Sequence, residues 1–82
     1  MVVAYVMLTV SPHTERKVCK LLSSMSEIVE VNELYGEYDI IIKVRLSSLQ
    51  ELDTFLTDKI RSIGDVRLTS TMIVAYEHKA EK

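Results

Sequence analysis

The sequence predicts an α+β fold in which a four-stranded antiparallel sheet carries two helices on one face. Two kinds of pattern predict it: short runs of β-branched residues with strand-like alternation, and two stretches with apolar residues at helical spacing. With 82 residues there is room for one domain. A domain of this size buries only about 63% of its unfolded surface, so a lone monomer would be marginal and we expect an oligomer.

The first half of the chain reads as strand, helix, strand. Val2 to Val10 is an unbroken apolar run, apolar on both faces, which is typical of a central strand. We expect a helix to start at Ser11 and Pro12, with Ser11 as its N-cap. Its apolar stripe is Val18, Leu21, Leu22 and Met25.

A hairpin and a second helix follow. The hairpin joins a strand over Ile28 to Tyr35 to a strand over Tyr38 to Leu46, through a turn at Gly36 and Glu37. Ser47 and Ser48 are candidate N-caps, with Gln50 and Glu51 as their reciprocal partners three residues on. The second helix continues to Gly64, where we expect a left-handed stop.

A last strand, Val66 to Tyr76, completes a β-α-β-β-α-β order. Right-handed crossovers then give the ferredoxin-like sandwich, with strand order 4-1-3-2 and the first and third strands at the centre. We place the domain at residues 1–78 and a polar C-terminal tail at residues 79–82.

The sheet face away from the helices is predicted to be apolar. A monomer would expose this face to water, and contiguous exposed apolar patches usually mark interfaces. We therefore expect two sheets to pack face to face in a two-fold dimer. Leu34 and Ala75 are expected on the same face. The predicted dimer contacts are Val3, Tyr5, Met7, Ile41 and Ile73.

Composition and charge argue against several classes of protein. Ten Lys and Arg against twelve Asp and Glu give a net charge of −2, unlike the strongly basic balance of phosphate-backbone binders. Cys19 is the single cysteine, so no internal disulfide or CxxC pair can form, and the short apolar start lacks the features of a signal peptide or membrane span. We expect a cytoplasmic protein without membrane attachment.

Catalytic and metal-binding patterns are poor. His13 and His78 lack sequence-near ligand partners, and Cys19 is expected as a small buried thiol rather than a nucleophile. We therefore predict no catalytic residue, no metal and no cofactor. A small dimeric enzyme of the isomerase or monooxygenase kind stays an alternative, with His13 and Tyr5 as its candidate cavity residues.

The most distinctive local pattern is the loop from Tyr35 to Asp39. A glycine in a hairpin leaves backbone amides accessible, and an acidic residue just after it can accept from an ammonium group, so the loop could hold a small zwitterion by both ends. The alternative is a plain turn with a capping aspartate. Thr69 and Thr71 fall on one face of the last strand as paired hydroxyls, or as simple strand formers.

These residues resemble a known family. The Gly36-Glu37-Tyr38-Asp39 turn, followed by Gly64-Asp65-Val66 and Thr69-Ser70-Thr71, is similar to the effector-binding domain of the Lrp/AsnC regulators, the RAM domain. The likeness runs from Val3 to about Glu77. It implies sheet-to-sheet dimers, four of which form an octamer, and a free amino acid bound between dimers.

The resemblance also implies which residues bind the ligand and what the module does. Gly36, Glu37, Tyr38 and Asp39 would form the loop part of the pocket, with Asp39 accepting from the ligand ammonium, and Thr69 and Thr71 would contact the ligand from a neighbouring strand. Because no residues precede the first strand for a helix-turn-helix, we expect a stand-alone amino-acid sensor that does not bind DNA directly. A full-length Lrp/AsnC regulator is a candidate partner; an ACT-type module is the other non-enzymatic alternative.

Overall fold

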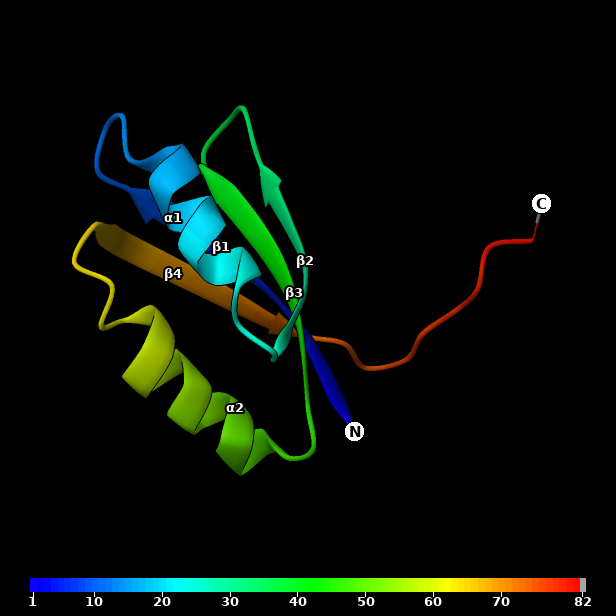
Figure 1. Ribbon diagram of the computed structural model, residues 1–82. Helices are drawn as coiled ribbons and strands as arrows, with labels where there is room; N and C mark the ends of the chain where they lie inside the picture. The colour runs from blue at the N-terminus through cyan, green and yellow to red at the C-terminus, as the bar shows by residue number, and fades with distance from the viewer. Residues whose placement is uncertain (82) are drawn as a thin grey trace.

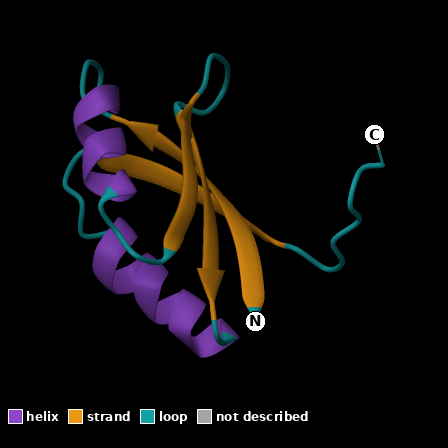
Figure 2. Cartoon of the chain, turned by 45° about the vertical axis from the view of Figure 1, so that its right-hand side comes forward, coloured by secondary structure: helices purple, strands orange, loops and turns teal. Residues whose placement is uncertain are grey.

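The computed structural model describes residues 1–81 and has the predicted α+β topology (Figure 1). The four-stranded antiparallel sheet has the order β2-β3-β1-β4, and both helices lie on one of its faces (Figure 2). The strands are β1 (Val2–Val10), β2 (Ile28–Glu33), β3 (Ile40–Leu46) and β4 (Val66–Ile73). The helices are α1 (Glu15–Ser23) and α2 (Leu49–Phe55), and η1 (Leu56–Ile60) continues α2 as a π-helical turn. The ferredoxin-like arrangement, with β1 and β3 central, is therefore confirmed.

β1 is the centre of the sheet. It pairs antiparallel with β3 on one side and with β4 on the other. Ala4, Val6 and Leu8 point toward the helices and are fully buried, whereas the residues between them are half-buried. This period of two separates a helix-covered face from an open face along the whole strand.

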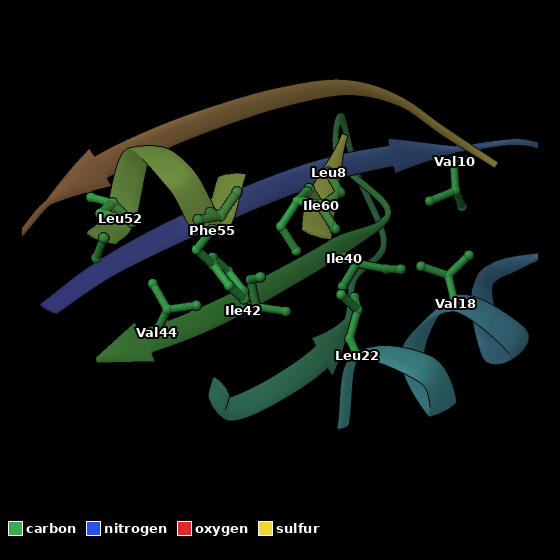
Figure 3. Packing of buried hydrophobic residues seen from close by; sticks show 12 residues of the cluster. Leu8, Val10, Val18, Leu22, Ile40, Ile42, Val44, Leu52, Phe55 and Ile60 are labelled. Carbon is green, nitrogen blue, oxygen red and sulfur yellow. The ribbon is translucent and has the colours of Figure 1, made fainter. Parts of the chain in front are cut away.

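The hydrophobic core lies between the sheet and the helices (Figure 3). Each fully buried aliphatic or aromatic side chain contributes about 1.5–3 kcal/mol relative to an exposed one. The core residues are Ala4, Val6, Leu8, Val10, Val18, Leu22, Ile40, Ile42, Val44, Leu52, Phe55 and Ile60.

Among residues 1–81, no helix is long and apolar enough to cross a membrane.

The first helix begins later than predicted. Ser11 and Pro12 lie in a turn that the Thr14 N–H closes by donating to the Ser11 carbonyl at 3.2 Å, and helical residues start at Glu15. The N–H of Ser11 instead donates to the Asp65 carbonyl at 2.8 Å. The predicted N-cap at Ser11 was wrong because this residue ties the end of β1 to the segment before β4.

The later start also changes which side chains α1 buries. Val18 and Leu22 are buried, and Met25 packs against the core just beyond the helix. Leu21 is 47% exposed, so its place in the predicted apolar stripe was wrong. The two buried positions are four residues apart, as expected for one face of a two-turn helix.

The strand ends differ from the sequence-based boundaries. β2 ends at Glu33 and β3 starts at Ile40, so a six-residue loop replaces the predicted two-residue turn, and Leu34 lies in this loop rather than on a strand. β4 ends at Ile73 instead of Tyr76. Lys82, the last residue of the predicted tail, lies outside the described residues.

The predicted cap of the second helix is confirmed at Ser48. Its hydroxyl accepts from the Glu51 N–H at 3.1 Å, and the Glu51 carboxylate accepts from the N–H and hydroxyl of Ser47. The helix ends differently from the prediction: the Arg61 N–H donates to the Leu56 carbonyl at 2.9 Å, five residues back. Gly64 does not have a positive φ, so the left-handed stop predicted there was wrong.

An ion pair joins η1 to the turn before β2. The Lys59 ammonium donates to Glu27 Oε2 at 2.7 Å. This hydrogen bond lowers the pKa of Glu27 below its ordinary range, although partial burial of the carboxylate opposes the shift. The contact holds the end of the α2 layer against the edge of the sheet.

Replacing Ser48 by Ala removes the N-cap of α2, and we expect this to cost about 1 kcal/mol of stability. The measurement is the urea midpoint at one fixed protein concentration, because oligomerisation contributes to apparent stability. Ser24→Ala is the matched control, since the Ser24 hydroxyl donates only to the Leu21 carbonyl of its own helix end. Equal midpoints for the two variants would contradict the capping role.

The Glu27 ion pair predicts a pH dependence. Since the folded-state pKa of Glu27 is lowered, the ionised carboxylate stabilises the fold at neutral pH, and this contribution is lost as the pH falls through that lowered pKa. Glu27→Gln should therefore be less stable than wild type near pH 7 and lose less stability on acidification to about pH 3. Thermal unfolding at both pH values measures this, with the exposed Glu81→Gln as control. The same acid-induced loss in wild type and Glu27→Gln would refute it.

Candidate functional site

Asp39 fixes the loop between β2 and β3 to the end of β1. Its N–H donates to the Leu8 carbonyl at 2.8 Å, and its carbonyl accepts from the Leu34 N–H at 2.8 Å. Its carboxylate Oδ2 accepts from the Val10 N–H at 2.9 Å. The capping aspartate considered in the sequence is thus present. Its carboxylate extends the β1–β3 hydrogen bonding past Ile40, the first residue of β3.

The rest of the loop projects into solvent. Tyr35, Gly36 and Glu37 are exposed, and Tyr38 and Asp39 are half-buried. Gly36 has a φ of 136°, a conformation that side-chain-bearing residues rarely adopt, and nothing lies within 4 Å of the position that a Cβ would take. A glycine is therefore needed here for backbone conformation, and its amide stands at an open loop tip.

Thr69 and Thr71 lie on one face of β4, as predicted. They are opposite Leu8 and Val6 in the β1–β4 register, so their side chains belong to the helix-covered face, at the free edge of the sheet. Both are half-buried. Ser70 is opposite Met7 and belongs to the other face.

The loop and the threonine pair are not joined within one chain. Leu8 stands between Ile40 and Thr69 in the register of the sheet. With neighbouring strands about 4.8 Å apart, the Cα atoms of Ile40 and Thr69 are separated by about 10 Å. Neither the groove beside α2 nor the small concavity beside Val74 to Glu77 is lined by any of the six candidate ligand-binding residues.

A groove lies elsewhere, between α2, the start of β2 and the end of β3. Its volume is about 800 Å³. Glu27, Lys59, Arg45 and Phe55 contribute to its lining, and Glu27 Oε2 accepts from Lys59 whereas the buried Glu27 Oε1 has no hydrogen-bond partner among residues 1–81. Sequence reasoning did not single out this pair because its members are 32 residues apart and no local pattern links them.

The open face of the sheet carries an apolar cluster, as predicted, with polar side chains beside it. The strand register assigns to it Val3, Tyr5, Met7 and Thr9 of β1, Ile41, Lys43 and Arg45 of β3, Leu68, Ser70 and Met72 of β4, and Glu30 and Asn32 of β2. Four of the five predicted dimer contacts share this face. Lys43 lies over the Tyr5 ring, with Nζ 5.9 Å from the ring centroid, so its stem covers part of the apolar surface.

Ile73 was assigned to the wrong face. It is opposite Ala4, whose side chain points toward the helices, so Ile73 belongs to the helix-covered side at the sheet edge, where it is 52% exposed. The prediction had placed it with Tyr5 and Met7; Met72, which is opposite Tyr5, occupies that face instead. The sequence predicted that Val66 to Tyr76 forms a strand, but it did not show which residues of this strand lie opposite which residues of β1, and that pairing decides the face of Ile73.

The remaining reactive side chains are dispersed. His13 is exposed at a φ of 70° in the turn after β1, and Tyr5 lies on the open face, so these two candidate catalytic residues do not share a site. Burial raises the pKa of the Cys19 thiol, and the nearby Glu33 and Glu15 carboxylates raise it further, which favours the unreactive protonated form. Within residues 1–81, no three potential metal ligands converge.

Comparison with known proteins places this geometry in a family. The family model described as the Lrp/AsnC ligand binding domain matches residues 3–82. The HTH-type transcriptional regulator FL11 of Pyrococcus horikoshii is 41% identical over 76 residues, which are 93% of this chain and 50% of that protein. FL11 of Pyrococcus furiosus is 38% identical over 78 residues. The chain therefore spans about half the length of the curated relatives it matches.

Solved structures agree in fold. The crystal structure of FFRP-DM1 is 42% identical with a TM-score of 0.88, covering 90% of this chain and 99% of that chain. Escherichia coli AsnC is 27% identical with a TM-score of 0.91, covering 99% of this chain and 55% of its own. Because the family model matches residues 3–82, this chain belongs to the Lrp/AsnC ligand-binding domain family.

Proposed function

We propose that this chain is an amino-acid-sensing module of transcription regulation that binds a free amino acid at an interface between dimers. The observation that carries the proposal is Asp39: one carboxylate oxygen is held by the Val10 N–H, and an ionised carboxylate has further acceptor capacity for a ligand ammonium. The exposed loop amides around Gly36 suit the ligand carboxylate. The curated relatives are transcriptional regulators, which supports a regulatory rather than an enzymatic role.

The spacing within one chain favours a site shared between chains. The Cα atoms of Ile40, which follows Asp39, and of Thr69 are about 10 Å apart with Leu8 of β1 between them, so the loop and the threonine pair lie on opposite sides of β1 rather than side by side. Glu37 and Tyr38 flank the same loop, and Thr69 and Thr71 from a neighbouring dimer would complete its contacts. An arrangement of four dimers, as the resemblance implies, would supply such contacts.

The open face supports the dimer within that assembly. Val3, Tyr5, Met7 and Ile41 lie together on this face, and a second sheet packed on them would remove the patch from water. Ile73 is not used for this contact, since it belongs to the opposite side of the sheet. A full-length Lrp/AsnC regulator, with the same domain, could join such assemblies as a partner.

The Asp39 variants test ligand binding separately from folding. Asp39→Asn keeps an oxygen that can accept from the Val10 N–H but removes the charge that attracts an ammonium, whereas Asp39→Ala removes both. We expect Asp39→Asn to remain near wild-type stability and to lose amino-acid affinity by roughly 10- to 100-fold, the effect of a lost charge-assisted hydrogen bond. Asp39→Ala should in addition lose about 1–3 kcal/mol of stability.

The measurement is isothermal calorimetry with each of the twenty amino acids, alongside thermal melts. Glu81→Gln, a charge removal in the exposed C-terminal segment, is the control. Wild-type protein that gives no heat with any amino acid at millimolar concentration would refute the sensor proposal. Undiminished affinity in Asp39→Asn would refute the role of Asp39.

Substitution of Ile41 tests the sheet-to-sheet dimer. Ile41→Lys puts a charge at the middle of the open face, opposite Met7, and we expect at least a tenfold weaker dimer because a buried unpaired charge is costly. Ile41 is half-buried in the monomer, so the fold should persist. Leu21→Lys, at an exposed apolar position on α1, is the matched control for sedimentation velocity. A 9.4 kDa wild-type species at micromolar concentration, or an unaffected Ile41→Lys dimer, would contradict this interface.

A further inference from the structure

The chain continues beyond β4 without joining the body of the domain. The Val74 N–H still donates to the Val3 carbonyl at 2.9 Å, and the segment then extends away from both helices (Figures 1 and 2). Tyr76 is 76% exposed, and its ring lies beside that of His78, at a centroid separation of 4.7 Å. A large aromatic side chain is thus held outside the core on an extended segment.

One contact ties the base of this segment to the open face. Glu77 Oε2 lies 3.9 Å from Lys43 Nζ. The Lys43 side chain is only 17% exposed, because its stem lies over the Tyr5 ring on the open face. Val3 and Val74 to Glu77 also line a small concavity of about 250 Å³ beside Met1. The segment therefore starts at the rim of the surface on which a second sheet would pack.

We propose that residues 75–81 form an arm that packs on a second copy of this chain, with Tyr76 as its anchor. The proposal rests on the proposed open-face dimer and adds a contact outside the sheets. The arm is continuous with the open face through the Glu77–Lys43 pair, and it extends beyond the sheet that carries it.

The chemistry of the arm suits a protein surface of this chain's own kind. A tyrosine pairs a large apolar ring with a hydroxyl, which is why tyrosines are enriched at the centres of interfaces. On the second copy, Leu68 and Met72 are exposed apolar side chains of the same open face and can receive such a ring at its margin. Glu77 neutralises Lys43 at the rim, so that a desolvated ammonium there keeps a counter-charge.

Dimer dissociation constants test the arm. Tyr76→Ala should weaken the dimer by roughly fivefold or more, the loss expected for truncating an anchoring interface residue. Tyr76→Phe should keep most of the affinity because it keeps the ring. Glu77→Gln should have a smaller effect than Tyr76→Ala, since the Lys43 contact is long. Lys20→Ala, an exposed position on α1 at the other face of the sheet, is the control and should leave the constant unchanged.

Sedimentation equilibrium over a dilution series, with the Ile41→Lys variant run in parallel, distinguishes failure of the open-face dimer from failure of the arm alone. A monomeric wild type would overturn both the open-face dimer and the arm. A wild-type dimer that Ile41→Lys disrupts but Tyr76→Ala leaves unchanged would overturn the arm alone. Because Tyr76 lies outside the core, the monomer fold should survive its replacement, which circular dichroism checks.

Discussion

The structure depends on one constraint: β1 must pair with a strand on each side and be apolar on both faces. Ala4, Val6 and Leu8 point into the core, while Val3, Tyr5 and Met7 point away from it. The first set attaches the sheet to the helices by burial of apolar area, the dominant favourable term in folding. The second set is only half-buried among the described residues, so the same burial of apolar area also favours a second copy on the open face.

The end of β1 links the candidate ligand loop to the rest of the fold. The Leu8 carbonyl and the Val10 N–H both bond Asp39, and the Ser11 N–H bonds the Asp65 carbonyl just before β4. The loop from β2 to β3 and the turn into β4 are therefore held by three residues at the end of β1, Leu8, Val10 and Ser11. A ligand that redistributes the hydrogen bonds of Asp39 would act on this strand end, and through its register on Thr69 in the neighbouring strand.

Much of the fold could be predicted because its signals are local or periodic. The alternation in β1, the Ser48–Glu51 cap and the glycine at position 36 each need only a few neighbouring residues, and each appears in the structure. The wrong predictions concern residues whose position is set by contacts with segments far away in the sequence. Ser11 bonds a residue 54 positions away instead of capping α1, and Ile73 lies on the side that its register with Ala4 dictates. Of the candidate site, the loop residues and the shared face of Thr69 and Thr71 were predictable, but their separation across β1 needed the sheet register.

We propose that the ligand site and the open face are both completed by further copies of the chain. Native mass spectrometry, with and without a mixture of the twenty amino acids, tests this proposal, since mass identifies both the number of chains and the bound ligand. We expect a dimer or a multiple of dimers that retains one kind of amino acid, which is lost when the assembly is dissociated into monomers. A monomer of 9.4 kDa that binds an amino acid by itself would contradict it.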